Sequence, residues 1–476
     1  MGRATTVRGE LAIMWSRATR LAVVAVVLVA VAAALSACSS EGRRPASGRG
    51  TPTTSGVPST TGAQLDRPFG VGRVTETFVD SSRPTPAGAG RAQRPERTIV
   101  TSILYPAAGD PQGDKGQNAP PAGGRFPLVV LSHGLGGNEE YLTPLAEQWV
   151  SAGYVVAIPH FPLTYAGTPD GIDGADVQNQ PGDVSFVIDA MLKANDSATA
   201  PLAGLVDPAR IGAAGHSNGG ITTLGAVGNS CCRDERIRTA LVLSGTPAPF
   251  AGGSYDFTDM PPVMFVHGIE DQMVSYNQTV ETFNDSAAPK ALLSMAQANH
   301  GDWLVPTNDV FPIAARATTD FLDAYLRGDP SAVERIASDQ SPPLATMSFA
   351  PDDDSAVTVS TVPVPETDRK ASVSADTDLR DGQVVTVTWS GFLPGRTVNV
   401  LQCVGDGRGG NASCGIAEGH VLVADPTGAG SIDLTVHTGA FANGACDAQH
   451  PCTILVNDSG LLDPEAFVYF PVTFAS

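Results

Sequence analysis

The sequence predicts an α/β domain with a mostly parallel, doubly wound sheet, followed by a C-terminal all-β immunoglobulin-like sandwich. Two observations predict this order. Between residues 127 and 295, continuous apolar runs alternate with helical patterns, as expected of strands that helices cover on both faces. After about residue 368 the apolar and polar residues alternate in short runs between Gly/Asp turns, and helical periodicity disappears. The second part has about the size of an immunoglobulin-like sandwich.

The strands of each part follow from these runs. Residues 71–79 and 98–105 alternate apolar and polar side chains, and are expected to begin the sheet. Residues 183–192 place four apolar side chains on one helical face. The later strands of the α/β domain are expected at 127–132, 154–158, 211–214, 240–244, 262–266 and 291–295. Those of the sandwich are expected at 384–388, 397–401, 431–436, 453–456 and 467–474.

The composition allows a folded chain and excludes one class of partner. Of the 476 residues, 42% are hydrophobic, which is enough for a globular core. Asp and Glu (49) outnumber Lys and Arg (29), giving a net charge of −20. Because an acidic chain repels phosphate backbones, we expect no nucleic-acid partner.

The N-terminus is expected to be a targeting segment. Arg17 and Arg20 precede an apolar run that ends in Leu35-Ser36-Ala37-Cys38. A positive region, an apolar core and small residues at its end are typical of a secretory signal, and the run is shorter than the ~20 residues of a spanning helix. The ending resembles a bacterial lipobox, which implies that Cys38 is acylated and anchors the chain to the membrane. An uncleaved signal anchor is the alternative, and the start codon is left open between Met1 and Met14.

These features predict five segments and an extracytoplasmic location. A Ser/Thr/Gly/Pro-rich stretch after the signal has almost no large apolar residues, so it is expected to be a flexible tether. Outside the membrane, disulfides are permitted. The expected segments are a signal peptide (1–37), the tether (38–65), the α/β domain (66–330), a linker with at most one short strand (331–367) and the β domain (368–476).

The strongest chemical signal is Gly215-His216-Ser217-Asn218-Gly219, directly after an expected strand and before a plausible helix start. In a nucleophile elbow of this type, a serine occupies a strained turn and glycines allow the neighbouring backbone to come close. We therefore predict that Ser217 is a catalytic nucleophile.

A serine nucleophile needs a base and an acid that orients the base. In this arrangement the chain order is serine, acid, histidine. Of the histidines that follow both Ser217 and Asp271, only His300 belongs to the α/β domain, on the loop after an expected strand. Asp271 follows the preceding strand and is the expected acid, with Glu270 as the neighbour to exclude.

The oxyanion of the reaction needs hydrogen-bond donors. The segment His133-Gly134-Leu135-Gly136-Gly137 follows a strand at the position of the H-G-G-G-type loop. The backbone N–H groups of Leu135 and Asn218 are the expected donors. His133 and His267 are expected to be hydrogen-bonded packing residues. No His/Cys/Asp cluster has metal-ligand spacing, so neither a metal nor a cofactor is expected.

Together these motifs resemble the dienelactone-hydrolase and cutinase-like branch of α/β-hydrolases, and the leading segments at 70–84 and 97–106 are similar to bacterial relatives of platelet-activating-factor acetylhydrolase. The motifs are HGLGG, GHSNGG, HGIED and NHGD, within about residues 66–330. The resemblance implies a carboxylic-ester hydrolase with Ser217, Asp271 and His300 as its triad. Dienelactone hydrolases proper use a cysteine nucleophile, so the serine favours ordinary esters. The short stretch between residues 244 and 262 leaves no room for a cap domain, so the site is expected to be open to lipid, polymer or small esters.

The C-terminal part resembles the apoproteins of the neocarzinostatin and macromomycin family. The similar segments are residues 379–403, 412–414 and 425–436. The family is a seven-stranded immunoglobulin-like sandwich with two local disulfides, which implies bonds between Cys403 and Cys414 and between Cys446 and Cys452. Residues lining the family's ligand cleft cannot be matched, so the ligand of this domain stays unknown, and a spacer or surface-binding role is the simpler hypothesis.

Several alternatives remain open from the sequence. Cys231 and Cys232 are adjacent and form either a vicinal disulfide or two buried thiols. The chain could be a non-catalytic surface-binding lipoprotein that acts through its β domain. The same triad could also serve a peptidase or amidase.

Overall fold

The computed structural model describes residues 68–87, 92–111, 114–169, 171–363, 368–408, 413–415, 419–441, 444–457 and 467–475. The expected signal peptide, the expected lipidation site Cys38 and the whole of the expected tether lie outside these residues. Within the described ranges, no helix has both the length and the apolar character needed to cross a membrane.

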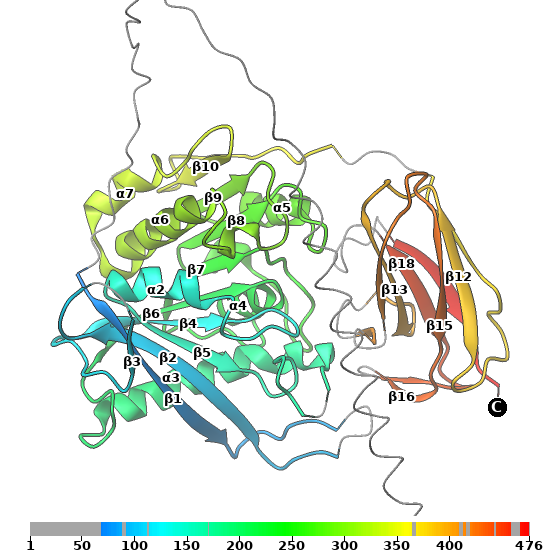
Figure 1. Cartoon of the computed structure of the whole chain (residues 1–476), viewed down its shortest axis with the longest axis horizontal. Coiled ribbons are helices and arrows are strands. Elements are labelled where there is room, and N and C mark those ends of the chain that lie inside the picture. The colour runs from blue at the N-terminus through cyan, green and yellow to red at the C-terminus, as the bar shows by residue number, and fades with distance from the viewer. Residues whose placement is uncertain are drawn as a thin grey trace, which may run out of the picture. The chain divides into compact units, whose positions relative to one another are not determined.

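The α/β domain is built on one sheet which, in the described residues, has ten strands in the order β10-β9-β8-β7-β6-β4-β5-β2-β1-β3 (Figure 1). The pairs from β5 through β4, β6, β7 and β8 to β9 are all parallel. β1–β2, β2–β5 and β9–β10 are antiparallel. This confirms the expected α/β-hydrolase fold. The strands are β1 (Gly70–Asp80), β2 (Arg97–Ala107), β3 (Asp114–Gln117), β4 (Phe126–Ser132), β5 (Val155–His160), β6 (Val206–His216), β7 (Ile237–Leu243), β8 (Val263–Gly268), β9 (Lys290–Met295) and β10 (Ala345–Ala350).

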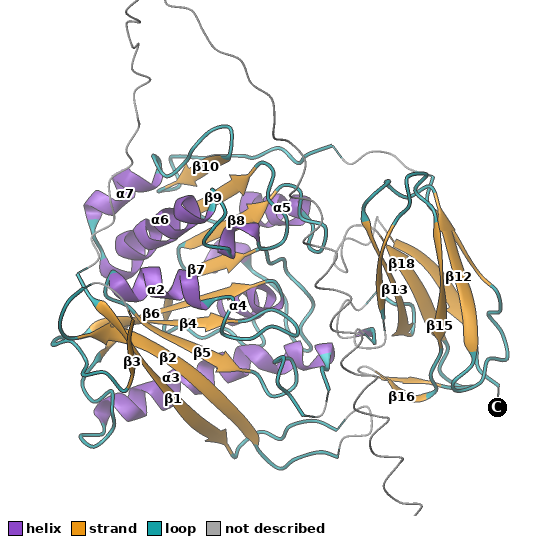
Figure 2. Cartoon of the chain, in the orientation of Figure 1, coloured by secondary structure: helices purple, strands orange, loops and turns teal. Residues whose placement is uncertain are grey.

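Helices cover both faces of this sheet (Figure 2). One core contains Leu145 and Trp149 of α2 with Phe321 of α6, and the other contains Val187 of α3 with Phe283 of α5. The central strands are therefore buried from both sides, which explains their continuous apolar runs. The helices are α2 (Thr143–Ser151), α3 (Gln180–Asp196), α4 (Asn218–Gly228), α5 (Tyr276–Asp285), α6 (Phe311–Leu322) and α7 (Pro330–Ile336), and a 3-10 helix, η1 (Gly174–Asn179), precedes α3.

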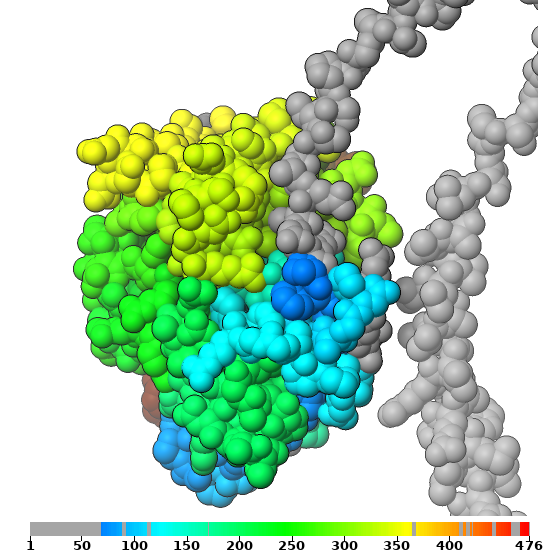
Figure 3. All heavy atoms as spheres, turned by 90° about the vertical axis from the view of Figure 1, so that its left-hand side faces the viewer, coloured from blue at the N-terminus to red at the C-terminus, as the bar shows by residue number. Residues whose placement is uncertain are grey.

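The α/β domain extends into the segment that the sequence suggested was a linker. Ala332 and Ile336 of α7 are buried in the core beside α6, and β10 pairs with β9 at the sheet edge. In Figure 3 the yellow residues of this segment lie directly against the yellow-green residues of α6. One side of α7 and one side of β10 face solvent, so each element has few apolar residues. The sequence of this segment therefore resembled a linker.

A strap formed by residues 357–362 then runs along α5. Asn284 donates from Nδ2 to the carbonyl of Val359 (3.0 Å) and accepts from its N–H at Oδ1 (3.0 Å). Asn277, two helical turns away, makes the same pair of bonds with Val362, at 3.0 and 2.9 Å. The side chains of Val359 and Val362 pack against the domain core. The strap therefore belongs to the α/β domain.

The C-terminal domain consists of two antiparallel sheets and a ribbon. Among the described residues one sheet has the order β11-β12-β15, the other has the order β14-β13-β18-β19, and β16 pairs with β17. Val387, Trp389, Val400 and Ile454 lie in the core between the sheets. The expected all-β sandwich is confirmed. The strands are β11 (Lys370–Val373), β12 (Val384–Ser390), β13 (Thr397–Val404), β14 (His420–Val423), β15 (Gly430–Thr435), β16 (Gly439–Phe441), β17 (Gly444–Cys446), β18 (Cys452–Asn457) and β19 (Phe467–Val472).

Three disulfides are present in the described residues. Cys403 is bonded to Cys414 and Cys446 to Cys452, which confirms both expected pairs. Cys231 and Cys232 are bonded to each other, so of the two alternatives the structure has the vicinal disulfide.

Candidate active site

Ser217 lies at the sharp turn between β6 and α4. Its backbone has φ 58° and ψ −120°, in the left-handed range that non-glycine residues rarely adopt. Its N–H donates to the carbonyl of Leu243 at the end of β7 (2.9 Å), which fixes the turn to the sheet. Such strain persists only where the surroundings enforce it, and it is typical of functional sites.

Two glycines make this turn possible. A Cβ at Gly215 would lie 2.0 Å from the carbonyl oxygen of Gly219, and a Cβ at Gly219 would lie 2.1 Å from the carbonyl oxygen of Ser132. Both distances are far below van der Waals contact. The G-x-S-x-G pattern is therefore required by backbone crowding at both ends of the turn.

Asp271 and His300 form a hydrogen-bonded pair beside the sheet. The Nδ1 of His300, after β9, lies 2.7 Å from Oδ2 of Asp271, after β8. The Asp271 side chain is completely buried, whereas the neighbouring Glu270 is exposed. The structure thus brings together the acid and the base that the sequence selected, and it leaves Glu270 out.

The surroundings of Asp271 keep it ionised. Its Oδ1 accepts from the backbone N–H groups of Met273 (2.8 Å) and Val274 (2.9 Å), and His267 Nε2 lies 3.1 Å from Oδ2. Burial alone would raise the pKa of Asp271, but its hydrogen bonds with His267 and His300 hold that pKa well below the ordinary value. A carboxylate is therefore available to orient the His300 ring. His267 is a packing residue, as expected, but its contact with the acid was not foreseen.

His216 connects the Ser217 turn to the loop that carries His300. Its Nε2 lies 2.6 Å from the carbonyl oxygen of His300, and its Nδ1 lies 3.4 Å from the hydroxyl of Tyr141. Burial lowers the pKa of His216 to about 3, so the ring is neutral and Nε2–H donates to the His300 carbonyl. Tyr141 also accepts from the N–H of Gly134 (2.6 Å). One histidine and one tyrosine thus tie three loops together, a link that the sequence did not indicate.

The expected oxyanion donors lie on either side of Ser217. Asn218 is the first residue of α4, so its N–H has no acceptor within the helix. Gly134 packs against the nucleophile, since a Cβ there would lie 3.2 Å from Ser217 Cβ, and Leu135 is the next residue. Among the described residues, the N–H of Leu135 makes no backbone hydrogen bond. Both N–H groups are therefore available to a ligand.

His133 is fully buried and holds this loop, as expected of a packing histidine. Its Nδ1 lies 2.7 Å from the carbonyl oxygen of Gly134, and its Nε2 accepts from the N–H of Phe161 (3.3 Å). Burial lowers its pKa to about 4, which keeps the ring neutral.

In the described part of the chain, no three His, Cys, Asp or Glu side chains gather as metal ligands. The C-terminal domain has a cavity of about 510 Å³ lined by Arg380, Asp381, Thr438 and Asp447, among others. Its charged and polar lining gives no indication of a particular ligand.

Comparison with known proteins identifies the C-terminal part. Residues 371–467 match the sequence profile of the neocarzinostatin family. This confirms the resemblance deduced from the sequence. Among solved structures, the chain is similar to a ferulic acid esterase from Streptomyces cinnamoneus, at 22% identity and a TM-score of 0.44, over 60% of this chain and 98% of that one. A search of curated protein sequences finds no match.

Proposed function

We propose that this protein is a serine hydrolase that cleaves carboxylic esters through an acyl-enzyme intermediate. The observation that carries this proposal is the hydrogen bond between His300 Nδ1 and the buried carboxylate of Asp271, at 2.7 Å, on the loops that follow β8 and β9. It is supported by Ser217 in its strained turn, and by the glycine-containing loop packed against that residue. The fold places these loops at the carboxyl ends of parallel strands, where ligands of open α/β sheets bind.

The proposed reaction has two halves, acylation and deacylation of Ser217, and His300 transfers a proton in both. His300 donates from Nδ1 to Asp271, so its Nε2 carries the lone pair that accepts the Ser217 Oγ proton as Oγ attacks the ester carbonyl. The N–H groups of Leu135 and Asn218 stabilise the oxyanion. His300 then gives the proton to the departing alcohol. Water then attacks the acyl carbon as it loses a proton to His300, and His300 returns that proton to Ser217 Oγ as the bond between Oγ and the acyl carbon breaks and the acid departs.

We further propose that the enzyme works on the extracytoplasmic face of a bacterial membrane, anchored through acylated Cys38. The support is the lipobox-like ending of the apolar N-terminal run. Disulfides in both domains are consistent with an oxidising compartment.

The test is a series of p-nitrophenyl esters of increasing acyl length, together with a fluorophosphonate label. We expect ester turnover and label on Ser217, and neither in Ser217→Ala. Label on Ser217 with turnover of peptide amides and not of esters would assign a peptidase. Absence of both label and turnover in the native protein would favour a binding function and overturn the proposal.

A further inference from the structure

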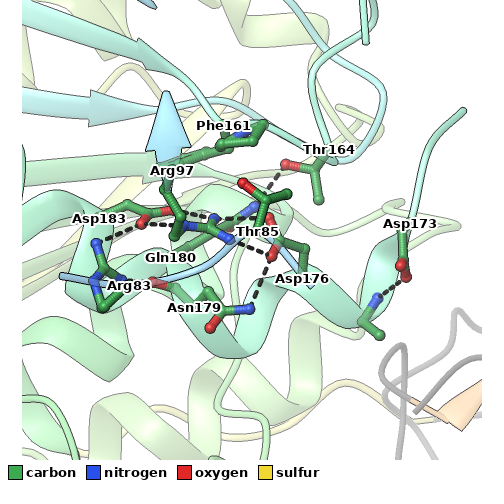
Figure 4. Close-up of polar contacts among 12 residues, drawn as sticks. Arg83, Thr85, Arg97, Phe161, Thr164, Asp173, Asp176, Asn179, Gln180 and Asp183 are labelled. Atoms are coloured by element: carbon green, nitrogen blue, oxygen red, sulfur yellow. Dashed lines mark hydrogen bonds and ion pairs between the residues drawn. The ribbon is translucent and has the colours of Figure 1, made fainter. Parts of the chain in front are cut away.

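A buried polar cluster lies at the start of α3, outside the proposed triad (Figure 4). Its centre is Arg97 of β2, which has no exposed surface. Arg97 binds Asp176 through Nη1 and Nη2 (both 2.9 Å) and Asp183 through Nε and Nη2 (2.8 and 2.5 Å). The two carboxylates come from η1 and the first turn of α3. Arg97 therefore fixes the junction between these helices to the sheet.

Arg83 and Asn179 make further contacts that hold the junction between η1 and α3 together. Arg83 donates to Asp183 (2.8 Å) and to the backbone carbonyl of Asn179 (3.2 Å), and Asn179 donates from Nδ2 to Asp176 (2.8 Å). Burial opposes the charge on Arg97, but the two carboxylates raise its pKa above the ordinary value. All of these contacts surround one position, residue 180, where η1 ends and α3 begins.

Gln180 is fully buried at that position, and Figure 4 shows its side chain beside Thr164. Nε2 donates to the hydroxyl of Thr164 (2.6 Å). Oε1 accepts from Nδ2 of Asn218 (3.2 Å) and from the hydroxyl of Thr222 (2.5 Å). The donor and acceptor ends of the amide thus bind two different segments of the chain.

One of these segments carries an expected oxyanion donor, and the other is hydrogen-bonded to the residue next to the second donor. The carbonyl of Thr164 accepts from the N–H of Gly136 (2.8 Å), directly after Leu135. On the other side, Asn218 is itself a donor residue. In the described structure its Oδ1 has no hydrogen-bond partner, so its side chain is held through Nδ2 by Gln180. Gln180 is therefore a bridge between the two halves of the expected oxyanion hole, on a different route from the contacts of His216 and Tyr141.

We infer that Gln180 is a positioning residue, which sets the distance between the N–H groups of Leu135 and Asn218 and so tunes stabilisation of the oxyanion. The inference rests on the proposed esterase function and names a residue that acts in it without touching the substrate. A glutamine is suited to this position because it donates on one side and accepts on the other. A glutamate would lack the donor for Thr164 and would place a third carboxylate near Asp176 and Asp183.

The test compares Gln180→Met, which keeps the length of the side chain, with Asn195→Leu at the other end of α3. Asn195 is a matched control because it is also a buried amide, and its Oδ1 accepts from the N–H of Val206 (2.8 Å). Both variants are measured in the full chain with p-nitrophenyl butyrate, and active sites are counted with a fluorophosphonate. Dividing turnover by labelled sites removes any loss that is due only to misfolding.

We expect kcat per labelled site to fall roughly 10- to 100-fold in Gln180→Met with little change in KM, which is less than the ~10²–10³-fold loss of an oxyanion donor itself. Asn195→Leu should keep kcat per site even if fewer sites fold. If Gln180→Met does not fold, Thr164→Val, which removes only the hydroxyl, replaces it and should lower kcat per site several-fold. The double variant should lose less than the product of the two single losses, because both break one bridge.

An unchanged kcat per site in Gln180→Met, or in Thr164→Val if the first variant does not fold, would overturn the inference while leaving the proposed function intact. A native protein that neither labels nor hydrolyses the ester would overturn both.

Discussion

The two domains bury different kinds of polar group. The α/β domain encloses full charges, including Arg97, Asp176, Asp183 and Asp271, each with several partners. In the described part of the β domain the buried polar side chains are uncharged, and two disulfides lie in or beside its cores. A larger domain buries a greater fraction of its surface and can tolerate desolvated charges, whereas small domains more often depend on covalent bonds. In the described residues, buried charge is therefore a property of the α/β domain, both at the candidate site and away from it.

The largest expected effect tests whether the chemistry belongs to the α/β domain. Ser217→Ala, His300→Ala and Asp271→Asn should each reduce kcat/KM for a p-nitrophenyl ester by about 10⁴-fold or more, because each removes one member of a cooperating triad. Glu270→Gln is the matched control and should retain turnover. Near-native turnover in His300→Ala would contradict the assignment.

The second prediction concerns buried charge. Arg97→Met leaves Asp176 and Asp183 in the interior with fewer partners, and should lower the free energy of unfolding by about 3–5 kcal/mol. Arg210→Met is the control, because its ion pair with Asp207 is at the surface and should contribute about 1 kcal/mol or less. Urea unfolding, followed by the helical circular-dichroism signal, measures both. Equal losses of unfolding free energy in the two variants would contradict this prediction, because the buried cluster would then contribute no more than a surface ion pair.

The third prediction concerns the covalent bonds of the β domain. Replacing Cys446 and Cys452 with alanine should lower the stability of that domain by about 2–3 kcal/mol, as the chain-entropy model gives for a short loop. Hydrogen exchange of peptides from residues 384–457 should report the loss. Ester turnover should not change. Replacing Cys231 and Cys232 in the α/β domain should leave the same peptides protected.

The fourth prediction is a pH dependence from a buried acid away from the candidate site. Burial, and then the nearby Asp320, raise the pKa of Asp339 to about 7. The protonated form is therefore favoured in the folded state, so its contribution to stability is full below the unfolded pKa of about 4 and is lost as the pH rises through about 7. The Asp339→Asn variant cannot ionise at this position, so it should not lose stability as the pH rises through 7. It should therefore have a larger free energy of unfolding than the native protein at pH 8. Asp207→Asn, at the surface, should keep the native profile, and an identical profile in Asp339→Asn would contradict the interpretation.

The smallest expected effect concerns the boundary between the domains. A chain ending at residue 363 retains α7, β10 and the strap, so it should hydrolyse soluble esters at close to the full rate. A chain ending at residue 345 loses β10 and the strap, and should unfold at lower urea concentration. Loss of turnover in the longer, folded chain would mean that the β domain is needed for catalysis.

The central strands and the order of the candidate triad could be predicted because their signals are local. Buried parallel strands have unbroken apolar runs, and the Ser217 turn needs glycines at fixed positions. The strands β3, β11 and β14 were missed because they are short, four residues each.

The contacts that support the site could not be predicted, because they join residues distant in sequence. Arg97 looks like any charged residue of an alternating strand, and its burial becomes evident only when η1 and α3 each bring a carboxylate to it. Gln180 likewise gave no signal, since its three partners lie 16, 38 and 42 positions away. His216 was visible inside the serine motif, but its bond to the carbonyl of His300 depends on the folded loops.

The strap along α5 has a consequence for how such proteins are assembled by recombination. Asn277 and Asn284 recognise only the main chain of Val362 and Val359. Other apolar side chains that pack against the core can therefore replace both valines, provided that neither position becomes proline, which lacks the N–H group that both asparagines require. A gene fusion that exchanges the C-terminal module should be joined after residue 363, so that the α/β domain keeps its own ending.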